Sequence, residues 1–227
     1  MNSVTENERS TTRAHLRPVN TDVKILCWIM TGPSNHYTRA IHVKNTWGSH
    51  CDKLIFMSSE EDAELGAVAL NVSEGRQNLW GKTKRAFQYC YQHHRDEFHW
   101  FLKADDDTFM VIENLREFLK PFDTNEPIHF GHHFKYLGVR LGRNRLRVFI
   151  KTDVQGYFAG GSGYVLSREA LRRFTQLGIP NPDICQSTDD GDEDVNMGTN
   201  YTIFKFFEFP RNVCLFTRSV GCYQETV

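Results

Sequence analysis

WFLKADDDTF, residues 100–109, joins a short apolar run to three consecutive aspartates. An apolar run of this length, bounded by polar residues, is typical of a buried β-strand. Asp105, Asp106 and Asp107 would then stand at the carboxyl end of that strand. Adjacent carboxylates repel one another, so folding alone gives no reason to group three of them. The stretch therefore predicts a buried strand that ends in a site for a positively charged partner.

Strands and helices are predicted to alternate on both sides of this stretch. Short apolar runs indicate strands, and apolar residues at helical spacing indicate helices. The expected strands are 23–32, 53–59, 99–107 and 127–134, and the expected helices are 36–47, 78–98 and 111–122. Ser34 and Asn35 are residue types that cap a helix, and 60–70 is left unassigned. The alternation indicates an α/β fold with a central, mostly parallel sheet flanked by helices.

Ligands of open α/β sheets bind beyond the carboxyl ends of the strands. The three aspartates and the loop 31–34 would both lie at that edge. A third segment, 155–174, combines glycines that let a ligand approach the backbone with a strand at 164–167 and a helix capped by Ser167. Its aromatic residues are expected to form a wall for a sugar or a nucleotide. The glycines are Gly160, Gly161 and Gly163, and the aromatic residues are Tyr157, Phe158 and Tyr164.

The composition is that of a globular protein. The chain has 227 residues, of which 40% are hydrophobic, and this length fits one large domain or two small ones. A formal net charge of −1 gives no general attraction to nucleic acid or to a membrane surface, so no nucleic-acid partner is expected. No apolar segment reaches the ~20 residues of a membrane span. Residues 1–20 are polar and are predicted to form a disordered arm.

The aspartate stretch suits a divalent cation bound to a diphosphate. Such a cation keeps water and phosphate oxygens and takes one or two carboxylates from the protein. Asp105 and Asp107, two residues apart, could hold it, and Asp106 could accept a hydrogen bond from a ribose hydroxyl. The alternative is that the aspartates complement the dipole of the helix at 111–122, which accounts for one of them but not for three.

A second acidic cluster, DDGDEDVNMG, covers residues 189–198. It lacks the spacing of an EF-hand loop, so a solvated turn and another kind of calcium loop stay open as alternatives. The functional alternative is a catalytic carboxylate. Transfer of a sugar needs a base for the acceptor hydroxyl and a cation for the departing diphosphate. The two acidic sites would then serve opposite faces of the sugar.

Six blocks of this sequence, in the same order, resemble animal core 1 β1,3-galactosyltransferases. These are glycoprotein-N-acetylgalactosamine 3-β-galactosyltransferases, which are related to fringe, and the resemblance spans roughly 23–198. The blocks are CWIMTGP (27–33), VKNTWGSHCDKLIFMSSE (43–60), EGRQNLWGKTKRAFQY (74–89), HWFLKADDDTF (99–109), GYFAGGSGYVLSREAL (156–171) and EDVNMG (193–198).

The resemblance implies a GT-A-like nucleotide-sugar-binding fold over 21–198, with Mn²⁺ as cofactor and UDP-galactose as donor. The implied reaction is inverting transfer of galactose to the 3-hydroxyl of GalNAc on Ser or Thr of a glycoprotein, in the Golgi lumen. It also allows a homodimer. Two alternatives are an impaired or inactive member that acts as a binding or chaperone-like protein, and a fringe-like β1,3-glycosyltransferase that uses another UDP-sugar.

The resemblance also implies a role for particular residues. Asp105 and Asp107 would bind the metal, and Asp106 would lie by the ribose. Asp194 would be the base, with Glu193 as the second choice. The residues expected along the nucleotide are Met30, Gly32, Glu74, Gly75, Arg76 and Lys82, and those expected to shape the sugar site are Gly160, Gly161 and Tyr164.

The sequence departs from the family pattern in three respects. It shows no type II membrane anchor. A basic insert at 136–153, which is predicted to form a hairpin that turns at 142–144, precedes the glycine-rich block. This insert could touch phosphate or could be a solvated hairpin. Residues 199–227 are expected to be atypical and truncated, without the late His that completes the metal site in the family, because no His follows His133.

The six cysteines form no CxxC pair, so a zinc site or a thioredoxin-type motif is not expected. Their wide spacing fits either disulfides in an oxidising compartment or buried free thiols. Cys27 and Cys51 flank the first predicted strand–helix unit and are the candidate disulfide pair.

Overall fold

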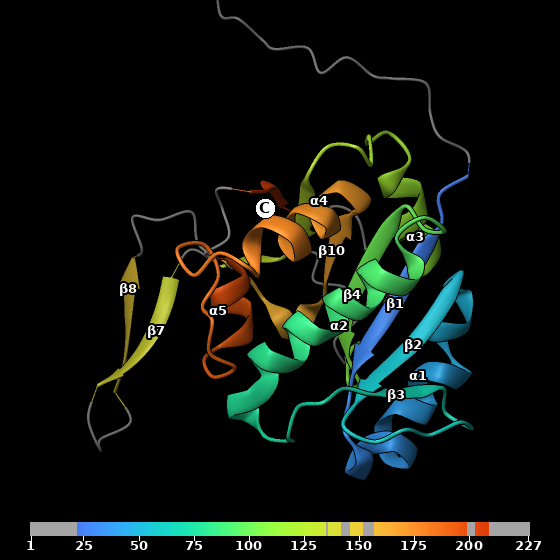
Figure 1. Cartoon of the computed structure of the whole chain (residues 1–227), viewed down its shortest axis with the longest axis horizontal. Coiled ribbons are helices and arrows are strands. Elements are labelled where there is room, and N and C mark those ends of the chain that lie inside the picture. The colour runs from blue at the N-terminus through green and yellow to red at the C-terminus, as the bar shows by residue number, and fades with distance from the viewer. Residues whose placement is uncertain (1–21, 135, 142–145, 152–156, 199–202, 209–227) are drawn as a thin grey trace, which may run out of the picture.

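The computed structural model describes residues 22–134, 136–141, 146–151, 157–198 and 203–208 (Figure 1). The predicted N-terminal arm 1–20, the predicted turn at 142–144 and most of 199–227 lie outside these residues. Within the described part of the chain, no helix has the length and apolar character that crossing a membrane requires.

A seven-stranded sheet forms the centre of the molecule, in the order β11-β5-β10-β4-β1-β2-β3. The strands pair in parallel except at β10, which runs antiparallel to both β4 and β5. The strands are β1 Ile25–Met30, β2 Lys53–Ser58, β3 Ala67–Ala69, β4 Trp100–Asp105, β5 Ile128–Gly131, β10 Tyr164–Ser167 and β11 Lys205–Glu208. The predicted α/β class with a mostly parallel sheet is confirmed. Strand β3 lies within the segment 60–70, which the sequence left unassigned.

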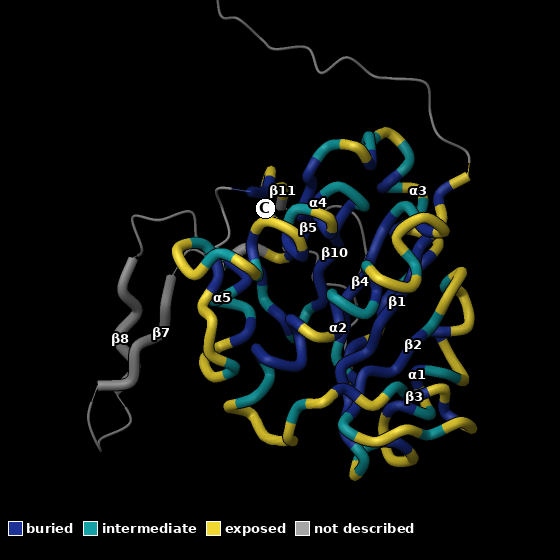
Figure 2. The backbone as a smooth tube through the Cα atoms, viewed as in Figure 1, coloured by how far each residue is buried: buried dark blue, intermediate teal, exposed yellow. Residues whose placement is uncertain are grey.

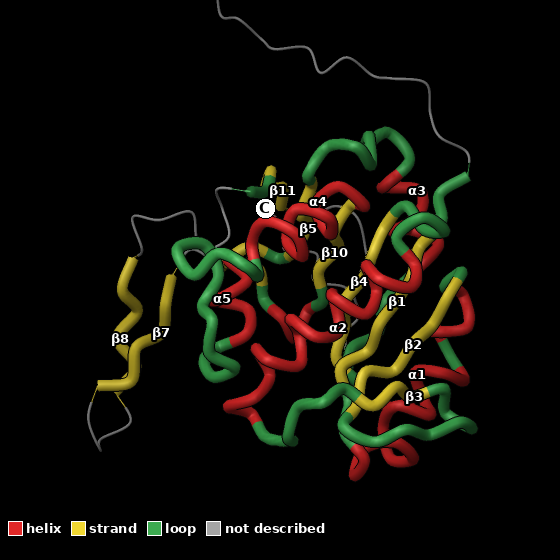
Figure 3. The backbone as a smooth tube through the Cα atoms, in the orientation of Figure 1, coloured by secondary structure: helices red, strands yellow, loops and turns green. Residues whose placement is uncertain are grey.

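Helices cover both faces of this sheet (Figures 1 and 3). Successive residues of a strand point to opposite faces, so each strand supplies side chains to both layers of helices. All of β1 is buried, and alternate residues enter two separate cores. Ile25, Cys27 and Ile29 pack in the core under α1 and α3, whereas Leu26 and Trp28 pack in the core under α2 and α4. The helices are α1 Ile41–Asn45, α2 Leu79–His94, α3 Ile112–Leu119, α4 Arg168–Arg173 and α5 Glu193–Gly198. Figure 2 shows the buried strands running between partly exposed helices.

The predicted helix at 36–47 is confirmed over 36–45, where a π-helical turn at His36–Ala40 runs directly into α1. A 3-10 turn at Trp47–His50 follows it. Asn35 stands at the start of this helix as predicted, but no side-chain cap bond forms there. Asn35 instead lies in a 3-10 turn, Pro33–Asn35, and its side-chain amide is bonded to Asp106. By contrast, Ser167 caps α4 as predicted, since its hydroxyl accepts the N–H of Ala170 at 3.1 Å.

The basic insert forms the predicted hairpin. Strands β7 Tyr136–Leu141 and β8 Leu146–Lys151 pair antiparallel with each other and belong to a sheet of their own. A second small ladder pairs β6 His133–Phe134 with β9 Tyr157–Phe158. The segment that carries the hairpin therefore begins after β6 and ends before β9, two strands that lie side by side.

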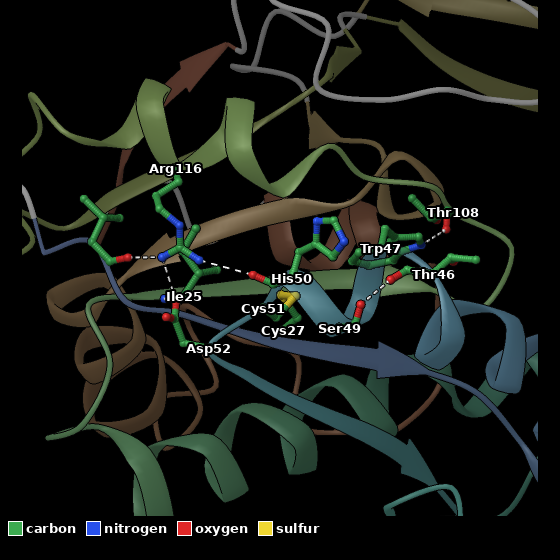
Figure 4. Close-up of a disulfide and its surroundings, with 11 residues drawn as sticks. Ile25, Cys27, Thr46, Trp47, Ser49, His50, Cys51, Asp52, Thr108 and Arg116 are labelled. Atoms are coloured by element: carbon green, nitrogen blue, oxygen red, sulfur yellow. Dashed lines mark hydrogen bonds and ion pairs between the residues drawn. A yellow bond between two sulfur atoms is a disulfide. The ribbon is translucent and has the colours of Figure 1, made fainter.

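The predicted disulfide between Cys27 and Cys51 is present and ties β1 to the segment before β2 (Figure 4). Polar contacts surround it. The Asp52 carboxylate accepts the N–H of Ile25 at 2.8 Å and an N–H of Arg116 from α3 at 2.7 Å. The indole N–H of Trp47 donates to the carbonyl of Thr108 at 2.9 Å. This region thus braces the loop that follows β4.

Candidate active site

The aspartate motif lies at the carboxyl end of β4, as predicted. Asp105 is the last residue of the strand and pairs in register with Met30 at the end of β1. Thr108 closes the turn that follows, because its N–H donates to the carbonyl of Asp105 at 3.1 Å. The Thr108 hydroxyl also donates to the carbonyl of Gly161 at 2.9 Å, which connects the motif to the glycine-rich turn.

Asp106 and Asp107 face the loop that follows β1. The buried Asp106 carboxylate accepts the hydroxyl of Thr31 at 2.8 Å and the amide of Asn35 at 3.0 Å. Burial raises the pKa of Asp106, although these two bonds act against the rise. Arg39 lies 3.6 Å from Asp106 and 3.5 Å from Asp107, whose side chain is 65% exposed. Asp106 therefore anchors this loop, and its role at a ribose stays a prediction.

Lys103, two residues before Asp105, is a buried lysine at the centre of the candidate site. Its ammonium donates to Asp105 Oδ1 at 2.7 Å and to the carbonyl of Gly160 at 3.0 Å, and it lies 3.5 Å from Glu193 Oε2. Burial alone would lower the pKa of Lys103, but the negative charges of Asp105 and Glu193 outweigh it and raise that pKa. Lys103 therefore stays charged and connects the aspartate motif to the Glu-Asp pair.

The Glu-Asp pair begins α5, and its two carboxylates have different surroundings. The buried Glu193 accepts the hydroxyl of Tyr164 at 2.5 Å in addition to its ion pair with Lys103. Asp194 is bonded to backbone, accepting the N–H of Gly160 at 3.3 Å and that of Val195 at 2.9 Å. Burial raises the pKa of both carboxylates. Glu193 therefore contacts two side chains of the protein, Tyr164 and Lys103. The hydrogen bonds described for Asp194 come from backbone N–H groups.

Gly160 has no room for a side chain. A Cβ at this position would lie 2.4 Å from Glu193 Oε2 and 3.2 Å from Lys103 Nζ. The glycine-rich turn therefore brings the backbone against the charged groups of the site. Contacts with Glu193 and Lys103 are therefore enough to explain why residue 160 is a glycine.

The predicted aromatic wall does not form as expected. Tyr164 is fully buried and Phe158 nearly so, and both pack in the core under α2 and α4. They point inward because β10 and β9 turn these residues towards the helices and not towards solvent. Tyr157 remains partly exposed. The Tyr164 hydroxyl is bonded to Glu193, and burial together with that carboxylate raises the pKa of Tyr164 well above the usual value.

Three of the residues predicted along the nucleotide, Gly32, Glu74 and Lys82, lie together beside Thr31. The buried Lys82 of α2 donates to the carbonyl of Thr31 at 2.6 Å and to Glu74 Oε1 at 2.8 Å. Glu74 in turn lies against Gly32, where an added Cβ would be 2.9 Å from Glu74 Oε2. The exposed Gly75 and Arg76 follow Glu74 in the chain. Thr31 therefore joins this group to Asp106.

The first half of the second acidic cluster has a structural role, which agrees with the solvated-turn alternative. Asp189 forms ion pairs with Lys84 at 3.1 Å and Arg85 at 3.6 Å, both from α2. The Lys84 ammonium also donates to the carbonyls of residues 186–188. These contacts hold the turn before α5 against α2, so that only Glu193 and Asp194 of this cluster approach Lys103.

The carboxylates at the end of β4 suit a hard divalent cation, because Mn²⁺ and Mg²⁺ prefer oxygen ligands. Among the residues that the structure describes, no group of three or more His, Cys, Asp or Glu side chains is placed to hold a metal. This donor set fits a cation that receives its other ligands from a diphosphate and water. Asp105 and Asp107 are the residues that would hold it.

Lys103 and Arg39 were not predicted, whereas Thr31 belongs to the loop 31–34 that the sequence placed at this edge. A signal for Lys103 existed, since a lysine inside an apolar strand needs a partner and shares a face with the residue two positions later, which is Asp105. Arg39 had no comparable signal, and the bond between Thr31 and Asp106 was not specified by the position of the loop. Their contacts with Asp106 join parts of the chain more than 60 residues apart.

The profile of the family described as Fringe-like matches residues 21–203. Glycoprotein-N-acetylgalactosamine 3-beta-galactosyltransferase 1 of Xenopus laevis is 48% identical over 154 residues, which is 68% of this chain and 39% of that protein. Beta-1,3-glucosyltransferase of Mus musculus is 28% identical over 150 residues, which is 66% of this chain and 28% of that protein. This chain thus spans 39% or less of the length of these two relatives.

Among solved structures, one similar chain is a glycosyltransferase involved in the glycosylation of the major capsid of PBCV-1. The superposition has a TM-score of 0.44 at 12% sequence identity, and it covers 82% of this chain and 81% of that one.

Proposed function

Because this chain belongs to the Fringe-like family, we propose that it transfers galactose from UDP-galactose to the 3-hydroxyl of GalNAc on Ser or Thr of a glycoprotein. The transfer inverts the configuration at the sugar. The choice of sugar and acceptor is supported by the relative of 48% identity, which is named as a galactosyltransferase that acts on glycoprotein N-acetylgalactosamine.

The observation that carries this proposal is the meeting of the two acidic groups across Lys103. A glycosyl transfer from a nucleotide sugar needs a cation site for the diphosphate and a base for the acceptor, held at a fixed spacing. Asp105 lies 2.7 Å from Lys103 Nζ, and Glu193, next to Asp194 in the chain, lies 3.5 Å from the same atom. This arrangement supports a single site with both parts.

Asp194 is proposed as the base, with Glu193 in a supporting role. A base must be able to give up its hydrogen-bond partners to the acceptor hydroxyl. Glu193 is buried between Tyr164 and Lys103, so taking a proton from a substrate would cost it both contacts. The raised pKa of Asp194 makes it a stronger base than an ordinary aspartate, which favours removal of the hydroxyl proton as the oxygen attacks the sugar.

Asp105 and Asp107 are proposed to hold Mn²⁺ with the diphosphate of the donor. A divalent cation there would neutralise negative charge on the departing UDP. Arg39 lies beside Asp107 and is half exposed, so it can turn towards a phosphate when the donor binds. Met30, Gly32, Glu74, Gly75, Arg76 and Lys82 are proposed to line the nucleotide. Gly160 and Gly161 are proposed to lie at the transferred sugar, with Tyr164 acting behind them through Glu193.

A donor assay tests the proposed reaction. The protein is incubated with labelled UDP-galactose and a GalNAc-serine acceptor, with Mn²⁺ and with EDTA. We expect labelled product that requires Mn²⁺ and that is lost in Asp105→Ala and Asp194→Asn. Arg95→Ala, which removes an exposed ion pair with Asp96 just after the end of α2, is the control and should keep its activity.

The same assay separates the alternatives. Transfer from UDP-glucose or UDP-GlcNAc in place of UDP-galactose would replace the proposed donor, as for a fringe-like or glucosyltransferase activity. Equal product from the wild type and from both aspartate variants would overturn the mechanism. Binding to a full-length transferase without any sugar transfer would favour the chaperone-like alternative.

A setting in the Golgi lumen is part of this proposal. It is supported by family membership, and the Cys27–Cys51 disulfide suits an oxidising compartment. The glycoprotein acceptor follows from the proposed reaction, and the homodimer stays a prediction.

A further inference from the structure

Lys103 contacts both acidic halves of the candidate site. Its side chain is 3% exposed, and its ammonium faces Asp105 of β4, the carbonyl of Gly160 and Glu193 of α5. An ammonium group has three N–H donors, and three acceptors lie around this one at 2.7, 3.0 and 3.5 Å. The ring of Tyr164 lies beneath it, with its centroid 5.7 Å away. The position of the charge is thus set from four sides.

A structural counter-ion for one carboxylate would not need this arrangement. Burying a lysine is unfavourable unless its charge is paired and its donors are satisfied. Lys103 is paired with two carboxylates that belong to different elements, β4 and α5. A change in the charge or position of Asp105 would therefore affect Glu193 through Lys103, and the reverse also holds.

We propose that Lys103 is a positioning residue that weakens the binding of a free divalent cation and holds α5 in place for transfer. The inference rests on the proposed function. Before the donor arrives, the ammonium occupies Asp105 and neutralises part of the negative charge that would attract a dication. Two positive charges next to one carboxylate repel each other, so Mn²⁺ alone binds poorly. The diphosphate of the donor adds the negative charge that offsets this repulsion, and the metal and the donor therefore load together.

The test measures Mn²⁺ affinity without nucleotide, by electron paramagnetic resonance of the free ion on the full chain. Lys103→Met removes the ammonium but leaves Glu193 buried without its ion pair, so a second variant, Lys103→Met with Glu193→Gln, removes both charges. We expect this double variant to bind Mn²⁺ about tenfold more tightly than the wild type, because the nearest repelling charge is gone. We expect its galactose transfer to fall, since α5 loses its tie to β4.

Two matched variants separate this effect from general damage. Glu193→Gln alone keeps Lys103 and removes one negative charge, so its Mn²⁺ affinity should equal that of the wild type or be weaker. Lys120→Met removes a partly buried lysine whose ion pair is with Glu117 and not with Asp105, and it should leave Mn²⁺ affinity unchanged. Tighter metal binding combined with slower transfer is a result that loss of folding would not produce.

The outcomes are distinct for the two proposals. If the wild type binds Mn²⁺ with UDP but the double variant binds free Mn²⁺ no more tightly than the wild type, the inference about Lys103 is wrong and the proposed function stands. If the wild type binds no Mn²⁺ with or without UDP, the proposed metal site is wrong and the inference falls with it.

Discussion

Asp194 is positioned by the backbone of Gly160 and by its place in the first turn of α5. Its carboxylate is held by the N–H groups of Gly160 and Val195, and its pKa is raised by burial. At this scale the chemistry depends on single contacts, so single substitutions test it most directly.

The first prediction concerns the pH dependence of transfer. A base works only when deprotonated, and burial moves the pKa of Asp194 upward. As pH falls, Asp194 therefore takes up its proton at a higher pH than a free aspartate, and activity is lost earlier than an ordinary aspartate would allow. The pH at which kcat/KM falls to half of its plateau on the acid side measures this.

The control for this profile is Asp194→Asn, which should lower kcat by about 100-fold or more at every pH because the base is absent. Glu193→Gln should keep a measurable profile, as Glu193 is not proposed to take the proton. An unchanged profile in Asp194→Asn would assign the base elsewhere.

The second prediction concerns Gly160→Ala. The new methyl group would lie 2.4 Å from Glu193 Oε2, so the Glu193 carboxylate must move away from Lys103 and Tyr164. We expect a destabilisation of about 1–3 kcal/mol, as for other overpacked buried sites, measured by urea unfolding. Transfer should fall by about 100-fold, since small displacements in a catalytic site have effects of that size.

Gly66→Ala is the matched glycine control. Its φ of +86° makes alanine strained, but an added Cβ meets nothing within 4 Å. We expect a loss of stability of about 1 kcal/mol with transfer unchanged. If Gly160→Ala behaves in the same way as Gly66→Ala, Gly160 has no special place in the site.

The elements of the sheet position these residues, and the sequence predicts most of the elements. The apolar runs of β1, β2 and β4 and the periodic α2 are readable because local burial determines their patterns. The absence of a side-chain cap at the start of the helix at 36 could not be predicted from the local pattern. Asn35, which the local pattern assigns to a cap, is bonded to Asp106 far along the chain, and the tertiary contact prevails over the local preference.

The third prediction concerns the disulfide between the first two strand segments. The double variant Cys27→Ala with Cys51→Ala lacks the cross-link between residues 24 positions apart, so its unfolded chain has a higher conformational entropy. We expect a loss of about 3 kcal/mol in the free energy of unfolding, measured by urea denaturation.

The wild type treated with a reductant should unfold at the same urea concentration as this variant. Agreement between the two would assign the effect to the covalent bond. A variant as stable as the oxidised wild type would show that the cross-link adds nothing to stability.

The whole molecule brings together residues that are distant in the chain. The sequence predicted both acidic clusters, the metal-type spacing of Asp105 and Asp107 and the order of the blocks. It did not predict that Lys103 joins the clusters, because Lys103 and Gly160 are 57 residues apart and their contact exists only once β4 and the glycine-rich turn have packed. The buried position of Tyr164 was missed for the same reason.

The fourth prediction concerns the stability of the whole molecule with its ligands. A ligand that binds only the native state stabilises it by about 2.7 kcal/mol at a concentration of 100 times its Kd. For a domain of this size we expect Mn²⁺ with UDP to raise Tm by about 5–10 °C. Differential scanning fluorimetry measures this, and Asp105→Ala should abolish the shift. No shift at millimolar Mn²⁺ and UDP would contradict the proposed site.

The pairing of β6 with β9 has an evolutionary consequence. His133 pairs in register with Phe158 and Phe134 with Tyr157, so the backbone ladder joins the two ends of the intervening segment. The cost of closing a loop between fixed ends grows only slowly with its length. A lineage can therefore lengthen, shorten or replace everything between these strands, and even graft a foreign module there, while the sheet keeps its register. The basic hairpin therefore occupies a position at which the chain can gain new segments without a change in the central sheet.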